Sequence, residues 1–269
     1  MKNINVAVIL AAGMGSRLKS VTKDEIPKGL IKVNGKSLVE RSIEKLRSVG
    51  IKKIYIVTGH LNHFYDEFAK GKGYIQTIKN RRYRTTGSMG SLAVLKDEIK
   101  EDFLLLEGDL IYEVYALIKA IEFPKQDCVL LSGKTNSGDE CYVEVRDENL
   151  YKISKDKTEI ENVYGELVGI SKISFDLFKE MIIENKKKTS RDWYWYDCDV
   201  VESNSDTKNI KKYDYENAIF DVAKNRKVGY LKIENLIWAE IDDSSHLERV
   251  NKFILPKLEK NIEETLGIY

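Results

Sequence analysis

The stretch Asn5-Val-Ala-Val-Ile-Leu-Ala-Ala-Gly-Met-Gly-Ser-Arg-Leu18 decides the fold of this 269-residue chain. Its first half is continuously apolar and rich in β-branched residues, as expected of a parallel strand that is buried on both faces. Its second half contains Gly13 and Gly15, where the backbone can turn tightly and approach a ligand. The stretch therefore predicts a buried strand whose carboxyl end leads into a ligand-binding turn.

Strands and helices are expected to alternate along the first half of the chain. Hydrophobic spacing predicts strands at 54–57, 74–78, 103–106 and 129–131, and helices at 38–49, 88–100 and 114–121. This alternation predicts an α/β fold: a doubly wound, mainly parallel but mixed sheet with helices on both faces, of the Rossmann-like type.

The second half of the chain has a different hydrophobic pattern. Residues 142–145 and 150–153 alternate polar with apolar side chains around a turn, which predicts an antiparallel hairpin at an edge or in a small lid. Further helices are expected at 175–188, 215–225 and 245–260, and strands at 228–233 and 236–241. We expect a single domain over 1–269, with its core at about 1–134 and 164–245 and lid elements at about 135–163 and 190–217.

The composition excludes several classes of partner. Forty-four Lys and Arg balance 43 Asp and Glu, so the net charge of +1 creates no basic field for nucleic acid or a membrane surface. The first apolar run, residues 6–12, is too short to span a bilayer and does not resemble a signal peptide. Three widely spaced cysteines fit a reducing compartment. We expect a cytoplasmic protein that binds a small molecule.

Two cations follow the glycine turn. Arg17 offers a forked guanidinium and Lys28 a compact ammonium, the two kinds of donor that suit a triphosphate. Backbone N–H groups of the turn, near a helix N-terminus, would bind phosphate oxygens. We expect Arg17 and Lys28 to be catalytic, and the nucleotide to be bound by Leu10, Ala11, Ala12, Gly13, Met14, Gly15 and Ser16.

Other interpretations of the glycine turn are weaker. A dinucleotide fingerprint requires Gly or Ala where this chain has Leu18, and a Walker loop ending at 35–37 requires Gly where it has Leu30. A plain tight turn after a strand would not explain why the glycines coincide with an arginine and a lysine.

With the later Pro27-Lys28, the glycine turn resembles the signature of the sugar-nucleotide and alcohol-phosphate nucleotidylyltransferase family. The resemblance extends to Glu107-Gly-Asp109 and Glu240-Ile-Asp242, so it covers most of the chain. It implies a nucleotidyltransferase in which Asp109 and Asp242 hold Mg²⁺ against the triphosphate and Glu107 lies at the nucleotide.

The loop at 85–91 is similar to the base-reading loop of the same family. Ser88, Met89 and Ser91 of this loop would then bind the nucleotide. The two serines would equally serve as caps of the following helix.

The residues around the two aspartates support a metal site independently. Asp109 follows a buried strand, at the end where open α/β sheets bind ligands. Two aspartates from distant strand ends, together with phosphate oxygens, suit Mg²⁺. The alternatives are that Asp109 caps a helix or lies in a surface turn, and that Asp242 caps the helix expected near residue 245.

The reaction implied is attack by an acceptor's phosphoryl or phosphonyl oxygen on the α-phosphorus, with pyrophosphate leaving. A phosphate monoester has its second pKa near ~6, so the nucleophile arrives ionised and needs no strong base. Catalysis then depends on position and charge neutralisation. His60, His63 and His246 are expected to be surface or loop residues.

Aromatic and acidic residues of the second half suggest that the acceptor carries an amine. They occur at 193–196 and 213–217, and such pairs bind ammonium groups through cation–π and ionic attraction. Packing of a lid against the sheet is the alternative. We expect the acceptor to be bound by Lys134, Glu166, Trp193, Tyr215, Glu216 and Glu240, with Lys134 on its phosphonate unless it is a solvated edge residue.

Within the family, the chain most resembles the cytidylyltransferases for amine-bearing acceptors. The run Tyr215-Glu-Asn217 is similar to the choline enzymes, whereas residues 132–134, 139–140 and 165–169 look closer to the 2-aminoethylphosphonate enzymes. The leading hypothesis is therefore CTP, Mg²⁺ and 2-aminoethylphosphonate. Phosphocholine, a sugar 1-phosphate, a catalytically silent nucleotide-binding module and an interaction protein are alternatives, and a homodimer or a fused partner domain is possible.

Overall fold

The structure is a computed structural model that describes residues 4–189 and 212–266, without the side chains of 262–266. Trp193 and the rest of the aromatic run at 193–196 lie outside the described residues, so its expected role stays a prediction.

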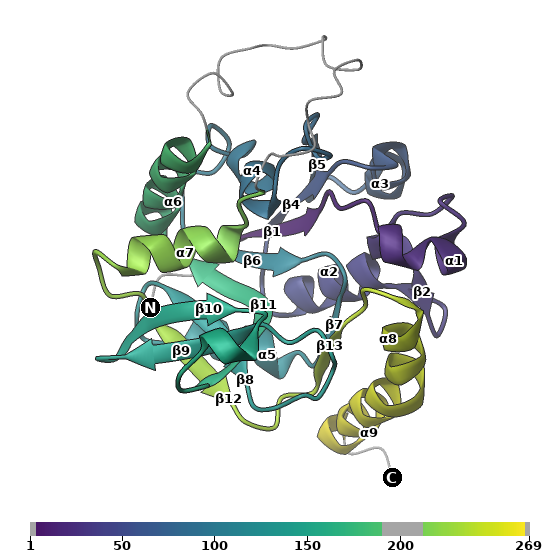
Figure 1. Cartoon of the computed structure of the whole chain (residues 1–269). Coiled ribbons are helices and arrows are strands. Elements are labelled where there is room, and N and C mark those ends of the chain that lie inside the picture. Colours follow the sequence, from purple (N-terminus) through teal and green to yellow (C-terminus); the bar gives the residue numbers. More distant parts are fainter. Residues whose placement is uncertain (1–3, 190–211, 267–269) are drawn as a thin grey trace.

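The described residues form a nine-stranded sheet and two two-stranded sheets (Figure 1). The large sheet contains β1 (Val6–Ala11), β4 (Lys53–Thr58), β5 (Ile75–Lys79), β6 (Phe103–Glu107), β8 (Cys128–Ser132), β9 (Tyr142–Arg146), β10 (Asn149–Ser154), β11 (Gly165–Ile173) and β12 (Tyr230–Ile233). Its order is β10-β9-β11-β6-β1-β4-β5, with β8 paired to β11 and β12 to β8. Because β1 is parallel to both β4 and β6, these strands present their carboxyl ends at one edge.

Helices cover both faces of this sheet, as the sequence predicts (Figure 1). One face packs against α4 (Ser88–Ala93), α6 (Phe175–Lys188) and α7 (Tyr215–Ala223), and the other against α2 (Leu38–Ser48), α3 (Asn62–Ala69) and α5 (Tyr115–Glu122). In β1, Val6 and Val8 belong to the first core, whereas Ala7 and Ile9 belong to the second. Burial on both sides explains the continuous apolar run.

The sheet is mixed because one long strand runs against its neighbours. The nine residues of β11 are all buried, and β11 is antiparallel to β6, β8 and β9. The sequence predicted no strand here, since glycine, serine and charged residues interrupt its apolar run, GELVGISKI, and it shows neither a continuous apolar run nor a regular alternation. The predicted hairpin is confirmed as β9 and β10, at one end of the sheet.

The helix predicted at 88–100 is wrong in length. Helix α4 ends at Ala93, and the following residues form successive turns with bonds such as Leu95 N to Leu92 O. Leu92, Leu95 and Ile99 are nevertheless all buried. The apolar spacing therefore predicted which residues are buried, but not where the helix ends.

A third, smaller core lies under the C-terminal helices, and it includes Leu18, Ile241 and Val250. Figure 1 shows α8 and α9 beside β7 and β13, away from α6 and α7. The elements of this region are α1 (Lys19–Thr22), β2 (Lys32–Val33), β3 (Lys36–Ser37), β7 (Leu110–Tyr112), β13 (Trp238–Glu240), α8 (Ser244–Arg249), a π-helical turn (Val250–Ile254) and α9 (Leu255–Leu266). The core brings the end of the chain against the segment that follows the glycine turn.

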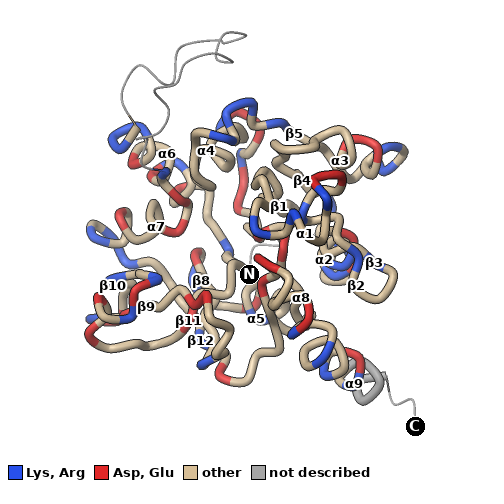
Figure 2. The backbone as a smooth tube through the Cα atoms, turned by 45° about the vertical axis from the view of Figure 1, so that its right-hand side comes forward, with Lys and Arg blue, Asp and Glu red and all other residues tan. Residues whose placement is uncertain are grey.

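Charged residues of both signs are interspersed along the described chain (Figure 2). No helix within 4–189 and 212–266 combines the length and the apolar character needed to cross a membrane.

Candidate active site

A cavity of about 480 Å³ lies at the turn that follows β1. Gly15 forms this turn in the left-handed region, with φ of +59°. Most of the predicted site residues line the cavity: Leu10, Ala12, Gly13, Met14, Gly15, Ser16, Arg17, Lys28, Ser88, Ser91, Glu107, Asp109, Glu166, Glu216, Glu240 and Asp242. A smaller adjoining pocket of about 230 Å³ is lined by Ala11.

The two aspartates, far apart in the sequence, meet at Lys28. The Lys28 Nζ lies 2.5 Å from Asp109 Oδ2, contacts Asp242 Oδ1, and lies 3.9 Å from Glu240 Oε1. Burial alone would lower the pKa of Lys28, but the charges of Asp109 and Asp242 raise it. The lysine is therefore held as a cation inside an acidic pocket.

A pair of short strands brings these groups together. Strand β13 runs antiparallel to β7, with Glu240 opposite Leu110, and Ile241 N donates to Asp109 O at 3.1 Å. Asp242 follows directly, so backbone hydrogen bonds fix its distance from Asp109.

Asp242 is free for the site because its neighbour caps the helix. Asp243 Oδ1 accepts hydrogen bonds from the backbone N–H groups of Ser245 and His246. Asp242 instead pairs with Lys28 and with Arg17, whose Nη2 lies 2.8 Å from its Oδ2. The capping alternative for Asp242 is therefore wrong.

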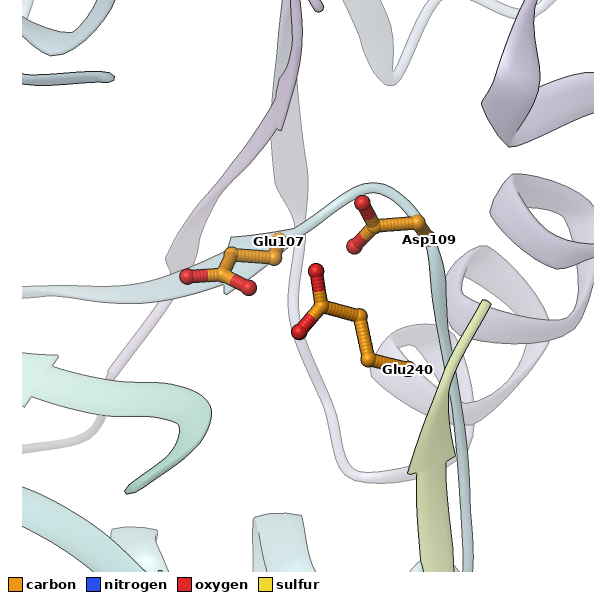
Figure 3. Close-up of side chains that lie close together, drawn as sticks. All are labelled: Glu107, Asp109 and Glu240. Carbon is orange, nitrogen blue, oxygen red and sulfur yellow. The ribbon is translucent and has the colours of Figure 1, made fainter. Parts of the chain in front are cut away.

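Three carboxylates lie together beside this pair (Figure 3). Glu107, Asp109 and Glu240 each offer an oxygen within 4.8 Å of the others. Burial, and next the charge of Asp109, raise the pKa of Glu107 to about 7 and that of Glu240 to about 10. Both shifts favour the protonated carboxyl, and a bound cation would favour the ionised form instead.

This arrangement fits a divalent cation. Asp109 Oδ1 is buried without a hydrogen-bond partner among the described residues, and carboxylate oxygens are the ligands that Mg²⁺ prefers. Glu107, Asp109 and Glu240 would hold the ion. The predicted pairing of Asp109 with Asp242 as ligands stays a prediction, since Asp242 is engaged by Lys28 and Arg17.

Three predicted contact residues do not line the cavity. Met89 is fully buried in the core, and Lys134 is exposed at the end of β8 without lining the cavity. Tyr215 is buried, and its hydroxyl donates to Glu107 Oε1 at 2.8 Å. The structure does not place Met89, Lys134 or Tyr215 at the cavity wall, so their expected contacts stay predictions, and the Tyr215 hydroxyl instead holds Glu107.

The start of α4 is tied to the start of α7. Ser88 N and Oγ donate to Asp214 Oδ1 at 2.8 and 3.0 Å, and Ser88 Oγ accepts from Tyr215 N. Ser91 Oγ accepts from Asn80 Nδ2 at 3.0 Å. Since Gly87 occupies the N-cap position of α4 without a side-chain bond, neither serine caps this helix.

Several residues that line the cavity were missed by the sequence reasoning: Asp139, Lys155, Trp238, His246 and Arg249. Lys155 follows the predicted hairpin, and it places a cation at the cavity, whereas Lys134 does not line it. His246 is buried rather than superficial, and its Nδ1 accepts from Asp242 N at 3.2 Å. The spacing of four residues between Asp242 and a helical histidine was the available signal for this contact.

Gly29 packs too tightly for any side chain. A Cβ there would lie 2.7 Å from Tyr65 Oη, 2.8 Å from Val39 Cγ2 and 2.9 Å from the carbonyl oxygen of Gly108. We expect Gly29→Ala to lower the free energy of unfolding by about 1–3 kcal/mol through overpacking, measured by urea denaturation. Gly73→Ala is the matched control, because a Cβ at Gly73 meets nothing within 4 Å. Equal stabilities of the two variants would contradict the prediction.

The fold and the site define a class of enzyme. Residues 7–167, more than half of the chain, match the family described as the MobA-like NTP transferase domain. The chain therefore belongs to this family, and it is a nucleotidyltransferase.

Individual relatives are similar over different shares of the chain. The CTP:phosphoglutamine cytidylyltransferase of Campylobacter jejuni is 27% identical over 258 residues, which cover 90% of this chain and 97% of that enzyme. The CMP-5'-(3-aminopropyl)phosphonate synthase of Streptomyces rubellomurinus is 32% identical over 129 residues, which cover 47% of this chain and 20% of the synthase. The inositol-1-phosphate CTP transferase from T. maritima superposes with a TM-score of 0.75 over 98% of both chains at 19% identity, which shows the shared fold.

Proposed function

We propose that the enzyme transfers CMP from CTP to 2-aminoethylphosphonate, giving CMP-aminoethylphosphonate and pyrophosphate. The observation that carries this proposal is a single cavity with two kinds of lining. The glycine turn, Arg17 and Lys28 offer donors for a triphosphate, whereas Glu216 offers a buried carboxylate oxygen without a partner among the described residues.

The choice of CTP is supported by the relatives. The names of the Campylobacter jejuni enzyme and of the T. maritima enzyme both specify CTP, and that of the Streptomyces rubellomurinus synthase specifies a CMP product. The product in that name also contains an aminoalkylphosphonate.

The amine is supported by the surroundings of Glu216. Burial, followed by the charges of Glu107 and Asp214, raises the pKa of Glu216 to about 8. An ammonium group beside Glu216 would supply the missing positive charge and a donor for Oε2. Trp238 lines the same cavity, and its aromatic face would add cation–π attraction.

The chain's own residues supply position and charge. Arg17 and Lys28 would bind the triphosphate and neutralise charge as pyrophosphate leaves, and Lys155 would hold the acceptor's phosphonate for attack on the α-phosphorus. The phosphonate oxygen carries the negative charge it needs, so no side chain has to remove a proton in this step. When bound, Mg²⁺ would neutralise phosphate charge next to Glu107, Asp109 and Glu240.

The test is pyrophosphate release from each nucleoside triphosphate with 2-aminoethylphosphonate, phosphocholine, inositol 1-phosphate or glucose 1-phosphate. We expect the highest kcat/KM with CTP and 2-aminoethylphosphonate. Turnover confined to a hexose 1-phosphate would refute the proposed acceptor while leaving the nucleotidyltransferase class intact.

Phosphoglutamine is a second candidate acceptor, since the relative that covers 90% of this chain is named for it. Arg249 lines the cavity and, within the described residues, donates only to the carbonyl oxygen of Thr135, at 3.2 Å. A guanidinium in this setting would pair with the carboxylate of an amino-acid acceptor. The same assay with phosphoglutamine distinguishes the two candidates.

Glu216→Gln removes the proposed partner of the amine. We expect the KM for 2-aminoethylphosphonate to rise about 10- to 100-fold, the effect of losing one hydrogen bond to a charged group. The KM for CTP should change little, and ethylphosphonate, which has no amine, serves as the control acceptor. An equal loss with both acceptors would show that Glu216 does not read the amine.

A further inference from the structure

One carboxylate holds two cations that come from different parts of the fold. Asp139 Oδ2 lies 3.2 Å from Arg17 Nη1, and Asp139 Oδ1 lies 2.9 Å from Lys155 Nζ. Arg17 belongs to the turn after β1, Lys155 follows β10, and Asp139 lies in the loop between β8 and β9. All three side chains line the same cavity.

In the proposed function, the two cations bind two different anions. Arg17 would contact the triphosphate, and Lys155 would contact the acceptor's phosphonate. Asp139 accepts hydrogen bonds from Arg17 Nη1 and Lys155 Nζ, the donors that the triphosphate and the phosphonate would need. The Arg17 and Lys155 side chains are 55% and 58% exposed, so their ion pairs with Asp139 are weak. A more highly charged triphosphate or phosphonate can therefore replace Asp139 as their partner.

We propose that Asp139 is a positioning residue that couples the binding of the two substrates, because it competes with the triphosphate for Arg17 and with the acceptor for Lys155. This inference rests on the proposed function. The two oxygens of Asp139 belong to one carboxylate, so a displacement that frees Arg17 Nη1 also releases Lys155, while Arg17 Nη2 keeps its ion pair with Asp242. A triphosphate bound at Arg17 would repel Asp139 and drive that displacement.

The coupling has a defined sign and is reciprocal. Release of Lys155 by the nucleotide tightens acceptor binding, and release of Arg17 by the acceptor tightens nucleotide binding by the same factor. Each pair joins an exposed cation to Asp139, whose side chain is 20% exposed, so we expect the factor to be roughly two- to fivefold.

Glu140 provides a matched control one residue away. Its carboxylate also lines the cavity, but it accepts from Gly138 N and Tyr142 Oη at 3.2 and 3.4 Å. No ion pair joins it to a cation within the part of the chain that the structure describes. Glu140→Gln therefore removes the same charge as Asp139→Asn without releasing Arg17 or Lys155.

The experiment is calorimetric titration of wild type, Asp139→Asn and Glu140→Gln with α,β-methylene-CTP and 2-aminoethylphosphonate, each alone and in the presence of the other. In Asp139→Asn, we expect each ligand alone to bind roughly two- to fivefold tighter and the coupling factor to fall to about one. Glu140→Gln should keep the wild-type coupling factor, and Asp139→Glu should restore it. These readouts separate coupling from a merely structural role, which would weaken both ligands.

The outcomes distinguish this inference from the proposed function. The role of Asp139 would be overturned if Asp139→Asn had the same ligand affinities or the same coupling factor as the wild type. This holds even if the enzyme turns over CTP and 2-aminoethylphosphonate as proposed. If the wild type does not bind 2-aminoethylphosphonate, the proposed acceptor fails on that result, and inorganic phosphate replaces it as the anion for Lys155 with the same two criteria.

Discussion

Asp109→Asn is expected to lower kcat by at least about a thousandfold, because it removes a charge from the centre of the carboxylate group that would hold the metal. Asp109 Oδ2 lies 2.5 Å from Lys28 Nζ, and its carboxylate lies together with those of Glu107 and Glu240. Asparagine has the same shape, so the variant should fold and should bind CTP in metal-free buffer within about threefold of wild type. Pyrophosphate release gives kcat, and electron paramagnetic resonance of Mn²⁺ reports metal binding.

The matched control is Asp97→Asn, since Asp97 is exposed and lies outside the cavity. It should retain wild-type turnover and Mn²⁺ affinity. Full activity of Asp109→Asn would remove this residue from the metal site and would return its carboxylate to a structural role beside Lys28.

The first βα unit and its ligand-binding turn were predictable because their signals are local. A continuous apolar run from Val6 to Leu10 requires burial on both faces, and glycine permits the left-handed backbone at Gly15. The edge at which β1 and β6 end follows from parallel pairing. These features depend on neighbouring residues and on one rule of topology.

The remaining site residues depend on contacts between distant segments. Asp242 and Asp243 have equal capping chemistry in the sequence, and only the pairing of β13 with β7 decides which one faces Lys28. Lys155, rather than Lys134, reaches the cavity because β10 ends there. No local pattern carries this information.

For Tyr215, too, the sequence did not reveal the interaction partner. Its aromatic ring and its acidic neighbour favoured an amine site, but its hydroxyl donates to Glu107 and its side chain is buried. The partner of this hydroxyl is set by how α7 packs on the sheet, and the residue type alone does not indicate it.

Lys28→Met is expected to have the second large effect, on stability as well as on turnover. The Lys28 side chain is only 13% exposed, and its Nζ lies beside Asp109, Asp242 and Glu240. Removing it leaves buried carboxylates without their cation, so we expect the free energy of unfolding to fall by about 3–5 kcal/mol. Urea denaturation measures this change, and Lys36→Met is the control because Lys36 pairs with Glu44 at the surface.

Magnesium separates the two consequences of this substitution. A divalent cation that binds the folded state alone stabilises it in proportion to the logarithm of its concentration. Millimolar Mg²⁺ should therefore restore part of the lost stability in Lys28→Met, since the uncompensated carboxylates attract the ion more strongly, without restoring turnover that requires Lys28 at the triphosphate. Equal stabilisation of Lys28→Met and of Asp109→Asn by Mg²⁺ would contradict a metal held by Asp109, because only the first variant keeps that carboxylate.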